Sequence, residues 1–167
     1  MELARELPHS NDAEVAVLGS IFIEPKLIID AIDVIKPEHF YSERNRLIFG
    51  AMYELFQTGV PIDAVTVGHY LEKQGVFDAI GGQNYLKDIL ASIPIPDNVK
   101  SYSQYIKEAY LLRCLIKTSD EITSLCYGGD NVPQIMDLAV AKIFDVVQQR
   151  DNQSVTNIRS CKERYLL

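Results

Sequence analysis

Apolar residues recur at steps of three and four along most of this chain, which is the spacing of amphipathic helices rather than of strands. In the first hundred residues, five such stretches are separated by proline, glycine and capping residues. The predicted helices cover residues 10–22, 25–35, 43–57 and 63–74, and a short fifth helix follows Gly81 and Gly82. Ser10 and Asn11 are candidate N-caps of the first helix, and Glu14 follows Asn11 at capping-box spacing. Gly68 weakens the fourth helix by about 1 kcal/mol relative to alanine.

From Val99 a single helical stripe continues to Tyr127 without a breaker, until Gly128 and Gly129 end it. A helix of that length spans roughly 40 Å, which is comparable with the whole diameter of a compact domain of this size. A last helix begins around Pro133 and must return antiparallel, because the connection is short. The predicted fold is therefore all-α, a compact multi-helix globule followed by a long antiparallel helical hairpin. Part of the hairpin should protrude, and its apolar residues then need a partner chain.

Three segments are expected along the chain. Residues 1–97 form a helical globular subdomain, residues 98–150 the helical hairpin, and residues 151–167 a linker with the start of a linker helix. The linker is the polar run at residues 151–154, after which Ile158, Cys161 and Tyr165 begin another helical stripe. Because the stripe stops so soon, a truncated piece of a longer polypeptide is favoured over an element that completes itself on a partner.

The chain has 16 basic and 23 acidic residues, a formal net charge of −7, and 47% apolar residues. This balance excludes a disordered tail and a basic DNA-coating protein. The first hundred residues hold 8 basic and 15 acidic side chains and the remainder 8 of each, so the net charge lies in the globule. Direct DNA binding should be weak and salt-sensitive, because each phosphate contact needs a lysine or arginine. No apolar run could span a membrane and no signal peptide precedes the globule, so a cytoplasmic protein is expected.

The motifs that catalysis or cofactor binding requires are missing from the sequence. It contains no G-x-x-x-x-G-K-[ST] loop for nucleotide phosphates, no G-x-S-x-G, and no histidines at metal-ligand spacing. Cys114, Cys126 and Cys161 are odd in number and far apart, which favours reduced side chains. We therefore expect no catalytic, cofactor-binding or metal-binding residues here. Acidic pairs such as Asp30 with Asp33 leave a small hydrolase as an alternative.

Apolar and aromatic side chains on the predicted hairpin exceed what the seam between two helices can bury. The set is Tyr102, Tyr105, Tyr110, Ile116 and Ile122. Any single member could equally pack on the globular half, but the set as a whole favours an interface with another chain. Tyr102, Tyr105 and Tyr110 are the residues expected in self-association on the hairpin.

Several short strings stand in a characteristic order along the chain. They are Leu7 to Ser10, Ala13 to Gly19, Phe40-Tyr41, Arg46 to Phe49, Gly59 to Asp63, Leu71 to Gly75, and Gly81-Gly82 with Tyr85-Leu86. As an ordered set they resemble the N-terminal domain of the bacterial replicative hexameric DNA helicase, the DnaB family. The resemblance runs from about Leu7 to Arg150, and Ile158-Arg159 resembles the start of that family's linker helix.

The resemblance implies a helical globule and hairpin, six copies of which form a two-tiered collar, a trimer of dimers, above an ATPase ring. It implies a role in ring assembly and primase docking during DNA replication. The expected partners are other copies of the chain, as a dimer and in a hexamer, and the C-terminal domain of primase, with a helicase loader as an open further candidate. ATP, Mg²⁺ and most DNA contact would belong to a C-terminal domain outside this sequence, so that this segment is itself non-catalytic.

Site residues carry over from the resemblance one at a time. Tyr85, in the string Gly81-Gly82-x-x-Tyr85-Leu86, matches a family tyrosine implicated in primase contact, and we expect it as an exposed aromatic anchor. Ile116 and Ile122 match a primase-contacting region of the first hairpin helix by spacing alone, and Arg113 and Lys117 flank it. A free-standing adaptor or loader that resembles the collar is the alternative to a helicase fragment.

Overall fold

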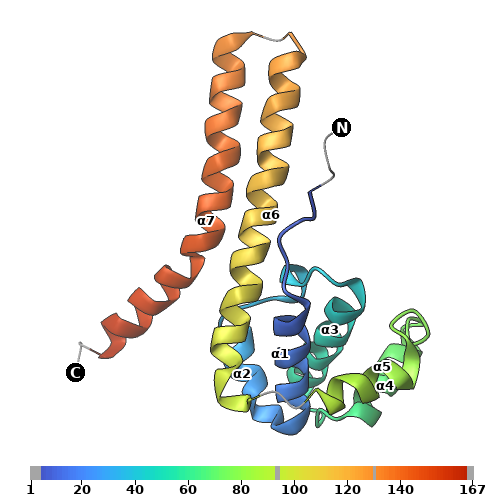
Figure 1. Ribbon diagram of the computed structural model, residues 1–167. Coiled ribbons are helices and arrows are strands. Elements are labelled where there is room, and N and C mark those ends of the chain that lie inside the picture. Colours follow the sequence, from blue (N-terminus) through green and yellow to red (C-terminus); the bar gives the residue numbers. More distant parts are fainter. Residues whose placement is uncertain (1–4, 93–94, 130, 165–167) are drawn as a thin grey trace. The chain divides into compact units, whose positions relative to one another are not determined.

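The computed structural model describes residues 5–92, 95–129 and 131–164, with residues 151–164 described by their backbone alone. Its helices are α1 (Asn11–Ile23), α2 (Ile28–Ile32), α3 (Glu43–Gln57), α4 (Ala64–Lys73), α5 (Gly82–Ala91), α6 (Val99–Tyr127) and α7 (Val132–Arg164). Within the described ranges there is no strand, and the all-α prediction is confirmed (Figure 1).

The helix boundaries follow the hydrophobic pattern closely, with two exceptions. Helices α3 and α6 begin and end at the residues that the pattern predicted. Helix α2 ends at Ile32, earlier than expected, after a 3-10 turn over Pro25–Leu27. The prediction that residues 151–154 are a linker that interrupts the last helix is wrong, because α7 continues to Arg164. Those four residues are polar but include no glycine or proline, so nothing in them ends a helix.

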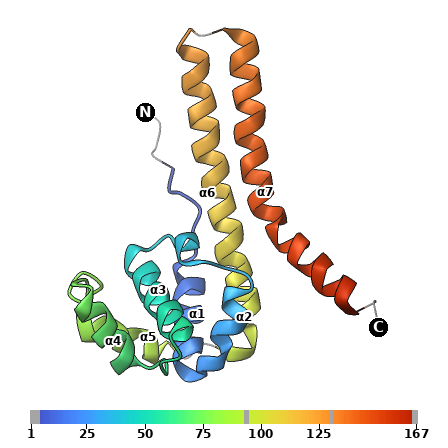
Figure 2. The ribbon, with the colours of Figure 1, turned by 180° about the vertical axis from the view of Figure 1, so that it is seen from behind.

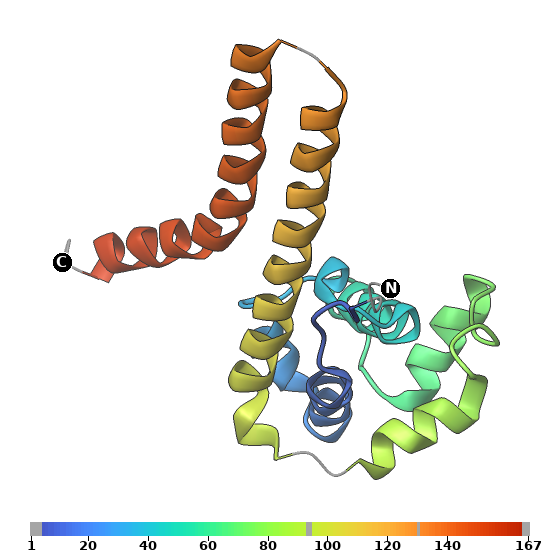
Figure 3. The same ribbon diagram turned by 45° about the horizontal axis from the view of Figure 1, so that its top comes forward.

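The chain divides into two compact units. The globular unit is His9–Tyr110, and the hairpin unit is Met1–Pro8 together with Leu111–Leu167. In the hairpin unit α6 and α7 run antiparallel and side by side, as Figure 3 also shows. The expected domain boundaries near residues 97 and 150 stay predictions. None of the described helices is long and apolar enough to cross a bilayer.

Helix α1 lies at the centre of the globular unit and packs on both α3 and α5. Figure 2 shows α3 between α1 and α4, and α3 contacts α4 and α2 as well. Val17, Leu18 and Ile21 of α1 are fully buried, and each contributes about 1.5–3 kcal/mol through removal of its side chain from water. The other large side chains of this core are Ile28, Ile35, Ile48, Phe49, Met52, Leu71, Ile80, Leu86, Ile89 and Ile106.

Two helices of the globular unit begin with side-chain caps that the sequence indicates. Ser10 is the N-cap of α1, and its Oγ accepts a hydrogen bond from the Ala13 amide at 3.3 Å. Asp63 caps α4, since its Oδ1 accepts from the Thr66 amide at 2.8 Å. The Thr66 hydroxyl in turn accepts from the Asp63 amide at 3.0 Å, which completes a capping box. Such caps satisfy backbone donors that the first helical turn leaves without partners.

Glu14 does not cap α1, and this part of the sequence prediction is wrong. Because Ser10 rather than Asn11 is the N-cap, Glu14 lies beyond the third helical position and turns into the core, where it is 2% exposed. Its carboxylate accepts hydrogen bonds from the Tyr41 amide at 2.6 Å, the Ser42 amide at 3.3 Å and the Asn45 Nδ2 at 2.8 Å. A buried carboxylate of α1 therefore binds the two residues before α3 and one residue of its first turn.

Gly68 has a packing role in the middle of α4. It is buried, and a Cβ at this position would lie 3.4 Å from Cε2 of Phe77 and 3.9 Å from Cδ1 of Leu86. Both distances are ordinary van der Waals contacts, so the site has room for one methyl group and not for a larger side chain. The Phe77 ring is thus the reason why a bulkier residue does not fit here.

We expect Glu14→Gln to lower the free energy of unfolding by about 2 kcal/mol, because the donors of Tyr41, Ser42 and Asn45 lose a charged acceptor. Thermal or chemical denaturation followed by circular dichroism measures this change. Asp12→Asn is the matched control, since Asp12 is an exposed carboxylate in the same helical turn. If the two substitutions lowered the free energy of unfolding equally, the hydrogen bonds of Glu14 would contribute no more to stability than an exposed carboxylate does.

We expect Gly68→Ala to raise the free energy of unfolding by up to about 1 kcal/mol, since alanine favours the helix and its methyl group meets Phe77 at ordinary contact distance. Gly68→Leu should instead be destabilising by about 1–3 kcal/mol through overpacking. Both changes are measured by denaturation of the purified chain. A loss of stability in Gly68→Ala would mean that the Phe77 ring cannot adjust to even one methyl group.

Candidate partner-docking site

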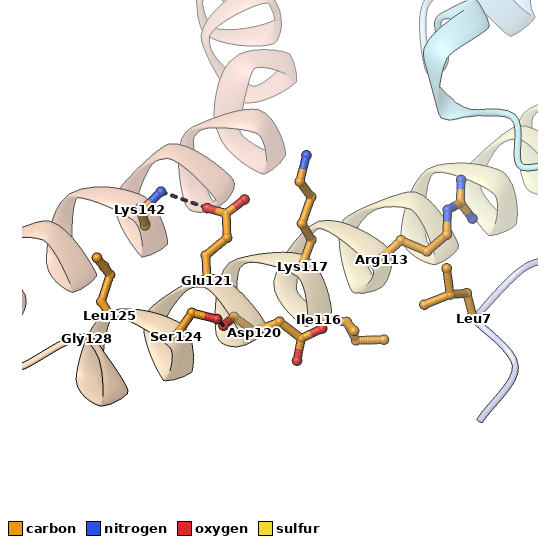
Figure 4. Close-up of a pocket in the computed structure, with 10 residues that line it drawn as sticks. All are labelled: Leu7, Arg113, Ile116, Lys117, Asp120, Glu121, Ser124, Leu125, Gly128 and Lys142. Atoms are coloured by element: carbon orange, nitrogen blue, oxygen red, sulfur yellow. Dashed lines mark hydrogen bonds and ion pairs between the residues drawn. The ribbon is translucent and has the colours of Figure 1, made fainter. Parts of the chain in front are cut away.

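A groove of about 830 Å³ follows one face of α6 in the hairpin unit (Figure 4). Three of the five residues expected at a partner interface, Arg113, Ile116 and Lys117, line this groove. Leu7 lies at one end of the row of side chains and Gly128 at the other. The remaining lining residues are Asp120, Glu121, Ser124, Leu125 and Lys142.

Helical periodicity explains which residues line the groove. Eight of the ten come from α6 and the turn after it, at steps of one, three and four, and these steps place side chains on one face of a helix. Ile122 is on the same helix but off this face, where it is half-buried. The structure thus brings Arg113, Ile116 and Lys117 together and leaves Ile122 out of the groove.

The charged residues of the groove are held in different ways. Lys142 of α7 donates a hydrogen bond to Oε2 of Glu121 at 2.7 Å, and this contact lowers the pKa of the Glu121 carboxyl (Figure 4). The Nη1 of Arg113 donates to the Pro8 carbonyl at 2.8 Å, so the segment before α1 is joined to α6. Lys117 is exposed and extends away from Ile116. With apolar walls and charges of both signs, the groove suits a polypeptide partner better than nucleic acid.

The seam between α6 and α7 contains polar contacts. Cys114 Sγ lies 3.8 Å from Gln149 Oε1, and the Glu121–Lys142 ion pair crosses the same seam. Among the described side chains of the hairpin unit, Thr118 and Val146 are the two that are buried. The hairpin therefore has almost no apolar core of its own.

Its apolar side chains face outward instead. The large exposed ones are Leu112, Leu115, Ile116, Tyr127, Val132, Met136, Leu138, Val140, Ile143, Phe144 and Val147. Val140 and Phe144 are 71% and 57% exposed and were missed by the sequence prediction, which followed a single helical stripe. The sequence does contain a pattern that predicts them: between Leu138 and Phe144, apolar residues occupy more than one face of α7.

The three tyrosines expected in self-association belong to the globular unit, and two of them pack there. Tyr102 is half-buried against the core, and the ring of Tyr110 lies 4.5 Å from that of His39. Tyr105 is 58% exposed. Of the three, Tyr105 alone is largely accessible.

Tyr85 is buried, and the expectation that it is an exposed anchor is wrong. Its side chain is 8% exposed, and its hydroxyl donates a hydrogen bond to Oδ1 of Asn45 at 2.5 Å. The guanidinium of Arg44 lies over the ring, 3.8 Å from the centroid. Arg44 and Asn45, two successive residues of α3, thus both contact the Tyr85 side chain of α5. This side chain points into the globular unit rather than toward solvent.

The position of Tyr85 is fixed from both sides. A Cβ on Gly81 would lie 3.1 Å from the Cβ of Tyr85, and the φ of +96° at Gly81 is one that residues with side chains rarely adopt. Burial raises the pKa of the Tyr85 phenol, and the Arg44 charge opposes that shift. The ring is therefore held neutral between Asn45 and Arg44 and has a structural role within the globular unit.

Neither unit shows a cluster suited to a metal ion within the described residues. A second hollow of about 530 Å³, in the globular unit, has Asp33, Lys36, Glu38 and Arg46 among its lining residues, with Tyr53 beside them. Its acidic and basic side chains are mixed, so the hollow offers no group of like charges that would bind a charged cofactor. Of the two hollows described, the groove on α6 is the one that combines apolar side chains with charged ones at the same face of a helix.

The chain is similar to a helicase family in sequence. The family described as DnaB-like helicase N terminal domain matches residues 6–108. The replicative DNA helicase DnaB of Geobacillus stearothermophilus is 34% identical over 153 residues, which are 91% of this chain and 34% of that protein. The chain therefore spans about a third of the length of the curated relatives that it matches.

Two solved structures have a similar fold. The crystal structure of the N-terminal domain of DnaB helicase from Mycobacterium tuberculosis matches with a TM-score of 0.80 and 31% identity, over 84% of this chain and 99% of that one. The N-terminal domain of DnaB helicase from Helicobacter pylori, described together with its interactions with primase, matches with a TM-score of 0.62 and 28% identity over 70% and 90% of the two chains. With its sequence and fold both matched in this way, the chain belongs to the family of DnaB-like helicase N-terminal domains.

Proposed function

We propose that this chain forms the collar of a replicative DNA helicase, where it assembles with other copies through its hairpin and docks the C-terminal domain of primase. The observation that carries the proposal is the distribution of apolar side chains on the hairpin. Its seam includes an ion pair and few buried side chains, whereas its outer faces carry large apolar residues such as Met136, Val140 and Phe144. Exposed apolar surface of this extent marks an interaction site, and another copy of the hairpin offers a matching apolar face.

Primase docking is supported by the groove along α6 and by the relatives. The groove combines Ile116 and Leu125 with the charged groups of Arg113 and Lys117, a composition that gives both an apolar anchor and orientation. The Helicobacter pylori domain is described with its interactions with primase. A collar of several copies offers several such sites at once, so that a moderate affinity at each one suffices.

In this proposal, DNA unwinding is carried out by another part of the helicase. ATP and Mg²⁺ would be used by the part of the relatives' length that this chain does not span, and most DNA contact would be made there. The acidic charge of the globular unit fits that division, since phosphate binding needs basic groups. We further propose that the chain forms dimers within a hexamer and acts in the cytoplasm. A helicase loader is a further candidate partner.

We expect the chain to self-associate, and the double substitution Val140→Asp with Phe144→Asp to weaken this association at least about tenfold, because two charges would be buried in an apolar contact. Light scattering or sedimentation across a range of concentrations measures the change. Gln134→Asp, which adds a charge at an exposed polar position of the same helix that is not at a step of three or four from Val140 or Phe144, is the control and should behave as wild type. A wild-type chain that stays monomeric at the highest concentrations would contradict the assembly role.

We expect Ile116→Ala to weaken binding to the cognate primase C-terminal domain about fivefold or more, through loss of an apolar anchor in the groove. Titration calorimetry measures the affinity, and circular dichroism should be unchanged because Ile116 is partly exposed. Ser119→Ala, at an exposed position of the same helix outside the groove, is the matched control. Equal affinities of the two variants would remove the groove from the docking surface.

A further inference from the structure

The segment before α1 contacts α6, although the two are far apart along the chain. The Nη1 of Arg113 donates a hydrogen bond to the Pro8 carbonyl at 2.8 Å, and this bond joins positions 105 residues apart. Leu7, the residue before Pro8, lines the groove on α6 at the end where Arg113 lies (Figure 4). Part of the groove is therefore formed by the N-terminal segment, residues 5–8, and not by the hairpin helices.

Arg113 differs from Lys117, the next basic residue of α6 in the groove. The Arg113 side chain is half-buried and one of its nitrogens is bound to the N-terminal segment, whereas Lys117 is exposed. A hydrogen bond from a charged donor is stronger than one between neutral groups. Arg113 thus ties the N-terminal segment to α6 through the Pro8 carbonyl.

A tie at Pro8 also restricts Leu7. A proline disfavours the helical conformation at the residue before it and favours an extended one, and residues 5–8 lie outside the helices. Once the Pro8 carbonyl is bound to Arg113, few directions remain open to the Leu7 side chain. Leu7 and Ile116 are 41% and 39% exposed and line the same groove, so both are apolar groups that a partner can reach.

We infer that Arg113 is a positioning residue that holds the N-terminal segment on α6, and that Leu7 is a further apolar contact of the docking groove in addition to Ile116. This inference rests on the primase-docking function proposed above and assigns residues that shape the same site. The partner group that enters this end of the groove is then an apolar side chain of the primase C-terminal domain. The docking surface is composite, because loss of either the segment or its tie to Arg113 opens this end of the groove.

Two other arrangements predict different results. If the Arg113 guanidinium contacts the partner directly, its loss and the loss of the Leu7 side chain act independently, and their effects on the binding free energy add. If the segment is a cover that the partner displaces, a shorter side chain at Leu7 strengthens binding. A positioning role predicts neither result, because without Arg113 the Leu7 side chain is no longer held in the groove and its truncation has little further effect.

The test is a double-mutant cycle of Leu7→Ala and Arg113→Met in the 167-residue chain, titrated with the cognate primase C-terminal domain by calorimetry. Methionine is a good helix former of similar length that lacks the donors of arginine, and circular dichroism monitors folding. Lys117→Met is the matched control, because it removes the charge of an exposed basic residue in the same groove. The methyl NMR signals of Leu7, assigned by their absence from the Leu7→Ala spectrum, report on the segment without any partner.

We expect Leu7→Ala and Arg113→Met each to weaken binding about fivefold, and the double variant to bind within about twofold of the weaker single variant. Leu7→Ala combined with Lys117→Met should instead show additive effects on the binding free energy. The Leu7 methyl signals should move toward the positions of an unstructured leucine in Arg113→Met and stay in place in Lys117→Met.

An additive double variant, about 25-fold weaker than wild type, overturns the positioning role of Arg113. Leu7 methyl signals that do not move in Arg113→Met overturn it as well. A Leu7→Ala chain that binds as tightly as wild type, or more tightly, overturns the contact role of Leu7, and primase docking survives each of these results. A wild-type chain that does not bind the primase domain overturns the docking function together with the contact role of Leu7, whereas a shift of the methyl signals in Arg113→Met then still supports the tie to α6.

Discussion

The globular unit depends on one buried carboxylate. Glu14 projects from α1 and accepts hydrogen bonds from the Tyr41 and Ser42 amides and from Asn45, so that the start of α3 is bound to α1. Asn45 extends this network to α5, because its Oδ1 accepts a hydrogen bond from the hydroxyl of Tyr85. A charge in the interior is costly unless its hydrogen-bonding capacity is used, and here it is used by groups from another helix. Three helices are thereby held in one relative position.

The hairpin unit follows the opposite principle. Its seam holds polar side chains and one cross-seam ion pair, while most of its large apolar side chains are in contact with water. In the proposed assembly, such a hairpin would gain most of its hydrophobic stabilisation from association rather than from its own folding. In the proposed collar, assembly and stability of the hairpin would be coupled for this reason, whereas the globular unit has a core of its own.

The proposed docking surface is an open groove along one face of α6 rather than a deep pocket. It supplies an apolar anchor at Ile116 beside the charged groups of Arg113 and Lys117. Each contact alone is modest, and a ring of copies multiplies them. In the proposed collar, several moderate contacts would let the partner exchange faster than one tight contact, because a weaker contact dissociates faster.

The sequence by itself determined the helices, because helical periodicity, caps and breakers are local properties; α3 and α6 have the predicted ends. It also determined the shared groove face of Arg113, Ile116 and Lys117, which helical spacing alone places together. Only the tertiary structure decided the burial of Tyr85 and the role of Glu14, because their partners lie 40 and up to 31 residues away along the chain. It likewise decided which hairpin faces meet solvent: amphipathic spacing gives the width of an apolar stripe, but packing against a second helix decides which part of it is buried.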